Sequence, residues 1–277
     1  MRAMLGITNF LFVPANRPDR IEKALSSGAD LVCMDLEDSV PPSEKDAARA
    51  VALEALARLA SPRLALRINS LATSAGLTDL LALATADTRP ELLFLPMVQS
   101  AAEPQQVASI LGEDTPSLIP LIETVQGLRN ADAIGACTGV CALMFGGGDL
   151  SAELGVQLAW EPLLAARSAL LMSCATNRIP AIDVPFIHLA DGPGLEDECL
   201  RAKIIGFSAK AAIHPNQIAT IASVMRPTAA EIAEAEQAVA AFDVGGGRAI
   251  AFNGRMLEAP VMQRYRRILN LAGGCAN

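Results

Sequence analysis

Two acidic residues stand where two successive apolar segments end. The segment from Ser117 to Ile122 is followed by Glu123, and the segment from Val140 to Phe145 is followed by three glycines and then Asp149. If both segments are neighbouring parallel strands of a barrel, the two carboxylates project into the same opening. Carboxylate oxygens are the ligands that a hard divalent cation such as Mg2+ prefers. The pair therefore predicts a metal site, and with it an enzyme.

Each acid taken alone also has a structural interpretation. Asp149 is placed to cap the helix that would follow it, and Glu123 is placed to pair with a neighbouring arginine. Their occurrence at consecutive strand ends favours a shared Mg2+ over two unrelated roles. The only histidines are His188 and His214, too few for typical zinc coordination. We assign no role to His188, and His214 suits a helix entry as well as it suits an acid or base.

An arginine and two further acids are expected at the same opening. Arg67 follows a short apolar segment, and its planar guanidinium would form a two-pronged contact with a substrate carboxylate or carbonyl oxygen. Asp35 and Glu37 follow the preceding segment and would orient metal-bound water. The alternative is a set of salt bridges, in which these two acids are partners of Arg67 and Lys45.

The elements that position these residues are short apolar segments alternating with helical patterns, which is typical of repeated βα units. The segments are Phe10 to Val13, Leu31 to Met34, Leu64 to Ile68, Leu92 to Leu95, Leu118 to Ile122, Val140 to Phe145, Ile179 to Val184 and Ser208 to Ile213. Eight strands in alternation favour a closed (β/α)8 TIM barrel, an α/β fold, over an open doubly wound sheet. We expect the barrel to occupy residues 1–226.

Residues 227–277 lie outside the eightfold pattern. A capping box at Thr228 and Glu231 predicts a helix to about Phe242, after which three glycines interrupt it. An Asn253-Gly254 turn follows a short extended piece, and a final helix is expected from about Pro260. This C-terminal extension is predicted to be a lid or a subunit contact.

Bulk composition narrows the class of protein. Of 277 residues, 52% are hydrophobic and 19% are charged, which suits a large core with strands covered on both faces. A net charge of -8 argues against nucleic-acid binding.

The first nine residues lack a signal-peptide pattern, and the longest uncharged stretch is too short to span a bilayer. We therefore expect a cytoplasmic protein with free, mostly buried cysteines. Lys210 gives weak support to a Schiff-base aldolase.

Ordered motifs along nearly the whole chain resemble the HpcH/HpaI aldolase and citrate lyase β-subunit superfamily, in its CitE-like branch. The motifs are Leu11 to Pro18, Asp35 to Val40, Arg67 to Asn69, Leu121 to Thr124, Phe145 to Leu150, Ala181 to Asp183, Ala212 to Pro215 and Asn253 to Pro260. The resemblance implies a TIM barrel that assembles as a homotrimer or a hexamer. It also implies a Mg2+-dependent carbon-carbon lyase acting on citramalyl-CoA, malyl-CoA or citryl-CoA, with acetyl-CoA and a 2-oxo acid as products.

The resemblance also implies roles for individual residues. Mg2+ would be held by Glu123 and Asp149, and Arg67 would engage the substrate, with Glu37 beside it. From their position near the end of the first apolar segment, and not from the resemblance, Arg17 and Lys23 are candidates for the CoA phosphates, although such residues are more often only solvated. Glu258 matches a lid aspartate that a neighbouring subunit donates to protonate the enolate in related malyl-CoA lyases.

Three departures from the family pattern keep alternatives open. Glu258 replaces the lid aspartate, Met97 replaces a common lysine, and Gly148 replaces an acid next to Asp149. Asp38 stands where class II aldolases for free 2-oxo acids carry histidine. Because that histidine is missing, such an aldolase is only the second hypothesis, and a catalytically inert protein that binds CoA esters is the third.

Overall fold

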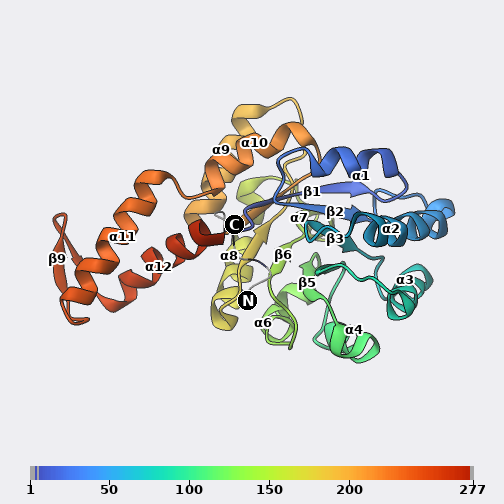
Figure 1. Ribbon diagram of the computed structural model, residues 1–277, viewed down its shortest axis with the longest axis horizontal. Helices are drawn as coiled ribbons and strands as arrows, with labels where there is room; N and C mark the ends of the chain where they lie inside the picture. Colours follow the sequence, from blue (N-terminus) through green and yellow to red (C-terminus); the bar gives the residue numbers. More distant parts are fainter. Residues whose placement is uncertain (1–3, 5, 275–277) are drawn as a thin grey trace.

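The computed structural model describes residue 4 and residues 6–274. Eight parallel strands form a closed barrel in sequence order, and β8 returns to pair with β1 (Figure 1). The strands are β1 (Asn9–Pro14), β2 (Leu31–Asp35), β3 (Leu64–Arg67), β4 (Leu92–Leu95), β5 (Ser117–Ile122), β6 (Leu143–Phe145), β7 (Ala181–Asp183) and β8 (Ala209–Ala212). The predicted (β/α)8 barrel is confirmed.

Helices surround the barrel and connect its strands (Figure 1). They are α1 (Pro18–Leu25), α2 (Lys45–Leu59), α3 (Ser74–Thr85), α4 (Ala102–Leu111), α5 (Val125–Arg129), α6 (Ala131–Gly135), α7 (Gly147–Leu154), α8 (Trp160–Asn177), α9 (Gly192–Ile205) and α10 (Ile218–Met225), with short 3-10 turns at η2 (Pro42–Glu44), η3 (Gly112–Asp114) and η4 (Pro215–Gln217). Strands β6 and β7 are shorter than predicted. Val140 forms only an isolated bridge to Leu118, so an apolar run overstates the strand it contains.

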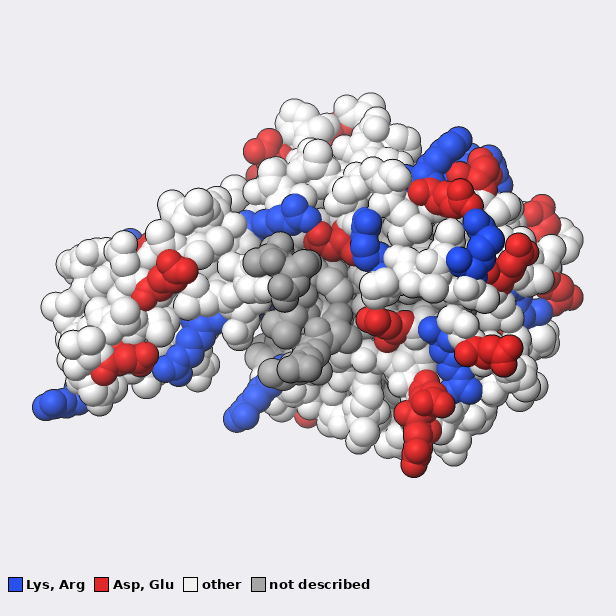
Figure 2. All heavy atoms as spheres, viewed as in Figure 1, with Lys and Arg blue, Asp and Glu red and all other residues white. Residues whose placement is uncertain are grey.

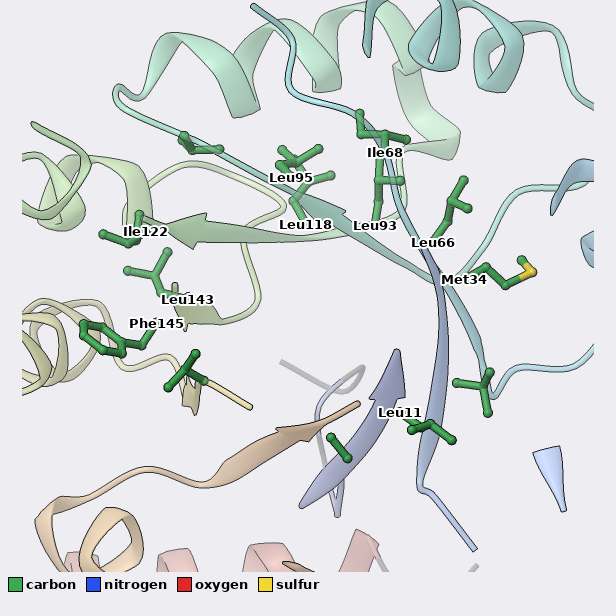
Figure 3. Packing of buried hydrophobic residues seen from close by; sticks show 14 of the residues in the cluster. Leu11, Met34, Leu66, Ile68, Leu93, Leu95, Leu118, Ile122, Leu143 and Phe145 are labelled. Carbon is green, nitrogen blue, oxygen red and sulfur yellow. The ribbon is translucent and has the colours of Figure 1, made fainter. Parts of the chain in front are cut away.

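Alternate residues along each strand face two different parts of the core. Leu11, Met34 and Leu66 belong to the large cluster between the strands and the helices, and Figure 3 shows such side chains projecting outward from the strands. Phe10 and Phe94 belong to the cluster inside the barrel, where their ring centroids lie 5.1 Å apart. The barrel interior is therefore filled with side chains, which leaves the strand ends as the place for a ligand.

The C-terminal extension consists of α11 (Ala229–Val244), the two-stranded hairpin of β9 (Ile250–Phe252) and β10 (Arg255–Leu257), and α12 (Ala259–Gly274). The predicted capping box forms at Thr228 and Glu231. Asn253 and Gly254 have φ values of 47° and 75°, as the hairpin turn requires. The extension is an arm that leaves the barrel, and its hairpin lies at the far end (Figure 1).

The arm is attached at the end of the barrel opposite to the strand exits. Arg267 of α12 donates hydrogen bonds to the carbonyl oxygen of Gly206 at 2.6 Å and to the hydroxyl of Ser208 at 3.2 Å. Both residues precede β8, so they lie at its N-terminal end. A separate small cluster that includes Phe242, Leu257 and Tyr265 holds the two helices of the arm together.

The outer surface carries charges of both signs, and the described cysteines are buried. Acidic and basic side chains are interspersed over the face in Figure 2, along the arm as well as over the barrel. Within the described ranges, no helix has the length and apolar character that crossing a membrane demands. Cys33, Cys137, Cys141, Cys174 and Cys199 are free and buried, whereas Cys275 lies outside the described residues.

Four charged side chains form a buried network between β7, β8 and the surrounding helices. The Lys210 Nζ atom donates to Asp183 at 2.6 Å and to Glu198 at 2.7 Å, and the Arg167 Nε atom donates to Asp183 at 2.9 Å. Lys210 and Asp183 are fully buried. Burial alone would lower the pKa of Lys210, but the two carboxylates raise it above its ordinary value. The Schiff-base role is therefore not supported, because a Schiff-base lysine must lose its proton.

We expect Lys210→Met to lower the free energy of unfolding by about 3 to 5 kcal/mol, because Asp183 would lose a buried countercharge. Lys203→Met is the matched control. Lys203 pairs with Glu231 at 3.4 Å near the surface, so its loss should cost less than about 1 kcal/mol. Urea unfolding of both variants measures the difference, and equal losses would contradict a special role for the buried lysine.

Candidate active site

A cavity of about 430 Å³ lies at the C-terminal ends of the barrel strands. Its lining contains the acids Asp35, Asp38, Glu123 and Asp149 and the arginines Arg20 and Arg67. Apolar side chains complete much of the wall, among them Phe12, Leu121, Met144, Leu158, Val184, Ile187 and Ile213. The structure thus brings the predicted metal ligands and Arg67 into one cavity. In its lining the acidic side chains outnumber the basic ones and lie beside an apolar surface.

Glu123 is held by backbone from two neighbouring strand exits. Its Oε1 atom accepts a hydrogen bond of 2.8 Å from the N–H of Met97, which follows β4. Met97 has a φ of 57°, a left-handed conformation that costs a non-glycine residue roughly 1 kcal/mol. On the other side, a Cβ atom at Gly146 would lie 2.1 Å from the Cγ atom of Glu123. Only glycine leaves room for the glutamate there.

Asp149 reaches the cavity from a helix rather than from a strand. It is an exposed residue in the first turn of α7, three positions after Gly146, which is the N-cap. No side-chain cap hydrogen bond forms at that N-cap. The expected placement at a strand end is therefore wrong in detail, because the glycines already begin the helix. The carboxylate still lines the same cavity as Glu123.

Arg67 is surrounded by three acids. Its Nε and Nη2 atoms donate to the two oxygens of Asp35 at 2.7 and 2.8 Å, and its Nη1 atom lies 2.8 Å from Glu37 and 3.5 Å from Asp38. The guanidinium also stacks over the ring of Phe12 at 4.7 Å. The salt-bridge alternative is thus confirmed for Arg67, although the same residue lines the cavity.

Electrostatics at the cavity favour binding of a cation. Burial, opposed by the charge of Arg67 and reinforced by neighbouring acids such as Glu123, raises the pKa of Glu37 to about 8. Burial also raises the pKa of Glu123 to about 7; the Met97 N–H and Arg67 oppose this, while the charge of Asp149 reinforces it. The positive charge of Arg67 alone therefore does not balance the negative charge of the acids around it. A divalent cation would supply the missing positive charge.

The donor set itself fits Mg2+. Glu123 and Asp149 offer hard oxygen ligands, and Mg2+ is commonly held by one or two carboxylates while water and substrate complete its coordination. No cluster of three or more His, Cys, Asp or Glu side chains suited to a metal occurs among the described residues. A site built from two carboxylates leaves positions open for a substrate.

The remaining predicted residues lie elsewhere. Arg17 is exposed and forms an ion pair with Asp19 at 3.1 Å, and Lys23 is exposed on α1; neither lines the cavity. Glu258 is exposed between β10 and α12, in the arm, and is not part of the cavity of its own chain. Sequence reasoning missed Arg20, which does line the cavity. Its spacing of three from Arg17 and Lys23 was the available signal.

Two alternative roles are resolved by local hydrogen bonds. His214 is the N-cap of η4, and its Nδ1 atom accepts a hydrogen bond from the N–H of Asn216 at 3.2 Å, so the helix-entry interpretation is confirmed. Lys45 donates to the backbone carbonyl oxygens of Leu36 and Glu37 at 2.7 and 2.6 Å. Pairing of Lys45 with the carboxylates of Asp35 or Glu37 is therefore wrong.

The fold and this cavity agree with comparisons to known proteins. The chain belongs to the HpcH/HpaI aldolase/citrate lyase family, whose model matches residues 9–215. Human mitochondrial citramalyl-CoA lyase is 31% identical over 95% of this chain and 84% of its own length.

Two solved structures are also similar. RipC from Yersinia pestis is 43% identical, covering 81% of this chain and 97% of that chain, with a TM-score of 0.73. CitE from Mycobacterium tuberculosis, in complex with magnesium, acetoacetate and coenzyme A, is 32% identical. It covers 99% of this chain and 100% of that chain, with a TM-score of 0.81.

We expect Gly146→Ala to weaken Mg2+ binding by at least about tenfold, since the new methyl group must displace the Glu123 carboxylate. Gly192→Ala is the matched control, because a Cβ atom there meets no atom within 4 Å. Isothermal titration with MgCl2 measures both affinities, and thermal unfolding checks that both variants are folded. Unchanged Mg2+ affinity in Gly146→Ala would remove the proposed constraint on Glu123.

Proposed function

We propose that the chain is a Mg2+-dependent carbon-carbon lyase that cleaves a short 3-hydroxy-3-carboxyacyl-CoA to acetyl-CoA and a 2-oxo acid. The observation that carries this proposal is the meeting of Glu123, Asp149 and Arg67 in one cavity. The names of the similar proteins support the same reaction class and the same cofactor. Free cysteines support a reducing compartment such as the cytoplasm.

The residues at the cavity would bind the metal ion and stabilise the charge that develops during cleavage. Glu123 and Asp149 would hold Mg2+, which when bound polarises substrate oxygens as a Lewis acid. Arg67 would stabilise negative charge on the 2-oxo acid oxygen, in an orientation already fixed by Asp35. Glu37, 2.8 Å from the Nη1 atom of Arg67, would help to hold the guanidinium in that orientation.

The charge of the lining favours citramalyl-CoA or malyl-CoA over citryl-CoA. Cleavage of citryl-CoA releases a 2-oxo acid with a second carboxylate, which needs a cation of its own. Arg67 already faces three acids, and much of the remaining wall consists of apolar residues such as Leu121, Met144 and Ile213. A second carboxylate against that apolar part of the wall would lose its water without a partner, at a cost of several kcal/mol, and of the cations in the lining only the exposed Arg20 could relieve that cost.

The arm would act on a neighbouring subunit. Glu258 carries an acid able to protonate the enolate of acetyl-CoA, but the arm joins its own barrel at the end opposite to the cavity. A homotrimer, or a hexamer built from trimers, would let each arm cover the cavity of another chain. The exposed hairpin residue Met256, which is 65% accessible, supports a subunit contact there.

We expect Glu123→Ala and Asp149→Ala each to reduce Mg2+-dependent cleavage of citramalyl-CoA by at least about a hundredfold, because each removes a ligand that the other cannot replace. Glu54→Ala, which changes an exposed acid on α2, should retain wild-type turnover. Release of acetyl-CoA is the readout, and EDTA should abolish it in the wild type. Full activity in either site variant would exclude that residue from the metal site.

The same assay decides between the hypotheses. Free 4-hydroxy-2-oxo acids serve as the competing substrates, each with and without EDTA. Turnover of these acids but of no CoA ester would establish the class II aldolase instead. Binding of acetyl-CoA without any turnover would establish the inert homologue.

Co-expressing a Glu258→Ala chain with a Glu123→Ala chain tests the role of the arm. Each variant alone should be inactive, but mixed oligomers contain sites that combine an intact barrel with an intact arm. If one neighbour supplies each arm, random mixing should restore roughly a quarter of wild-type turnover. Specific activity of the purified mixed oligomer is the measurement. A mixture as inactive as its parents would contradict donation between subunits.

A further inference from the structure

The lining of the cavity divides into a charged part and an apolar part according to the strand from which each residue comes. The residues at or after the ends of β2, β3, β5 and β6 include the charged side chains Asp35, Asp38, Arg67, Glu123 and Asp149. Every lining residue that follows β7 or β8 is apolar, and these residues are Val184, Pro185, Ile187 and Ile213. Because β7 and β8 are neighbours in the barrel, these four residues form one surface, the β7–β8 wall.

Hydrogen bonds from two buried side chains fix this wall. The Lys210 Nζ atom donates to the carbonyl oxygen of Val184 at 2.7 Å. The Nε2 atom of Gln217 donates to the carbonyl oxygen of Phe186 at 2.7 Å, and its Oε1 atom accepts from the N–H of Ile213 at 3.0 Å. One buried amide group therefore joins the connection after β7 to the exit of β8. The separation of Val184 from Ile213 is thus set by the fold.

The direction of a bound 2-oxo acid follows from this division of the lining. A 2-oxo acid that binds Mg2+ through its carboxylate and its 2-oxo oxygen turns the substituent on C2 away from the ion. The ion position is defined by Glu123 and Asp149, and Arg67 with its acidic partners occupies the ends of β2 and β3. The uncharged surface that remains beside the ion position is the β7–β8 wall, so an apolar substituent fits there.

Two residues of the wall directly follow their strands. Val184 follows β7 and is only 6% exposed, and its branched side chain has little rotational freedom. Ile213 follows β8 and is 42% exposed, so a ligand that covers it removes apolar surface from water. The methyl group of pyruvate would gain from this contact, whereas the hydrogen atom of glyoxylate would leave the surface uncovered.

We propose that Val184 and Ile213 contact the substituent on C2 of the 2-oxo acid and favour pyruvate over glyoxylate. The preferred substrate of the lyase is then citramalyl-CoA rather than malyl-CoA, a conclusion that rests on the proposed function. The contact with the 2-oxo acid itself requires only the metal site.

The test measures the Kd of glyoxylate, pyruvate and 2-oxobutyrate by isothermal titration of the MgCl2-saturated protein, without a CoA ester. We expect Val184→Ala to lower the preference for pyruvate over glyoxylate about tenfold and to improve binding of 2-oxobutyrate relative to pyruvate, because one methyl contact is lost and space is gained. Ile213→Ala should act in the same direction. Val184→Ile adds one methylene group, so it should weaken 2-oxobutyrate relative to pyruvate about tenfold.

Leu81→Ala is the matched control, because Leu81 is 61% exposed on α3 and lies outside the cavity lining. It should keep the affinity ratios of the wild type. Thermal unfolding checks that every variant is folded.

Two outcomes would overturn the contact. One is a set of affinity ratios that stays unchanged in both Val184→Ala and Ile213→Ala, and the other is an equal loss for all three acids. Binding of none of the acids by the wild type would overturn the contact together with the metal site. Altered ratios in a protein that cleaves no CoA ester would support the contact and contradict only the proposed function.

Discussion

The ion pair between Asp35 and Arg67 is the interaction on which the rest of the site depends. The two residues are register partners on the adjacent strands β2 and β3, so closure of the barrel places them side by side. Asp35 also accepts hydrogen bonds from the N–H groups of Glu37 and Ser39. Burial would raise the pKa of Asp35, but the charge of Arg67 lowers it below its ordinary value. The pair therefore stays ionised and fixes the plane of the guanidinium.

Fixing Arg67 in this way leaves the other acids of the cavity with too little countercharge. Glu123 is buried, and burial raises its pKa. Its carboxylate accepts a hydrogen bond from the N–H of Met97 after β4, and it fits only because Gly146 after β6 has no side chain. A buried carboxylate without a bound cation lowers the stability of the folded protein, because desolvation disfavours its charged form. The left-handed backbone of Met97 adds strain at the same point. Both costs are explained if the carboxylate serves a bound cation.

The sequence predicted those features that depend on periodicity and on short-range motifs. Eight strands, the capping box at Thr228 and the Asn253-Gly254 turn follow from local chemistry, and all are present. It did not predict that Asp149 stands on a helix, because the three preceding glycines signal both a close approach and a helix start. Nor did it predict that Arg20, and not Arg17, lines the cavity, since Arg17 pairs with Asp19 instead. The direction in which the arm carries Glu258 depends on packing of α12 below β8, which no local pattern encodes.

The central claim is that one Mg2+ ion is bound by Glu123 and Asp149 beside Arg67. A crystal structure of the chain with MgCl2 and pyruvate tests it most directly. We expect a six-coordinate ion with one oxygen from each carboxylate and two from pyruvate, within reach of the Arg67 guanidinium. An ion bound elsewhere, or pyruvate bound with neither carboxylate near a metal, would contradict the claim.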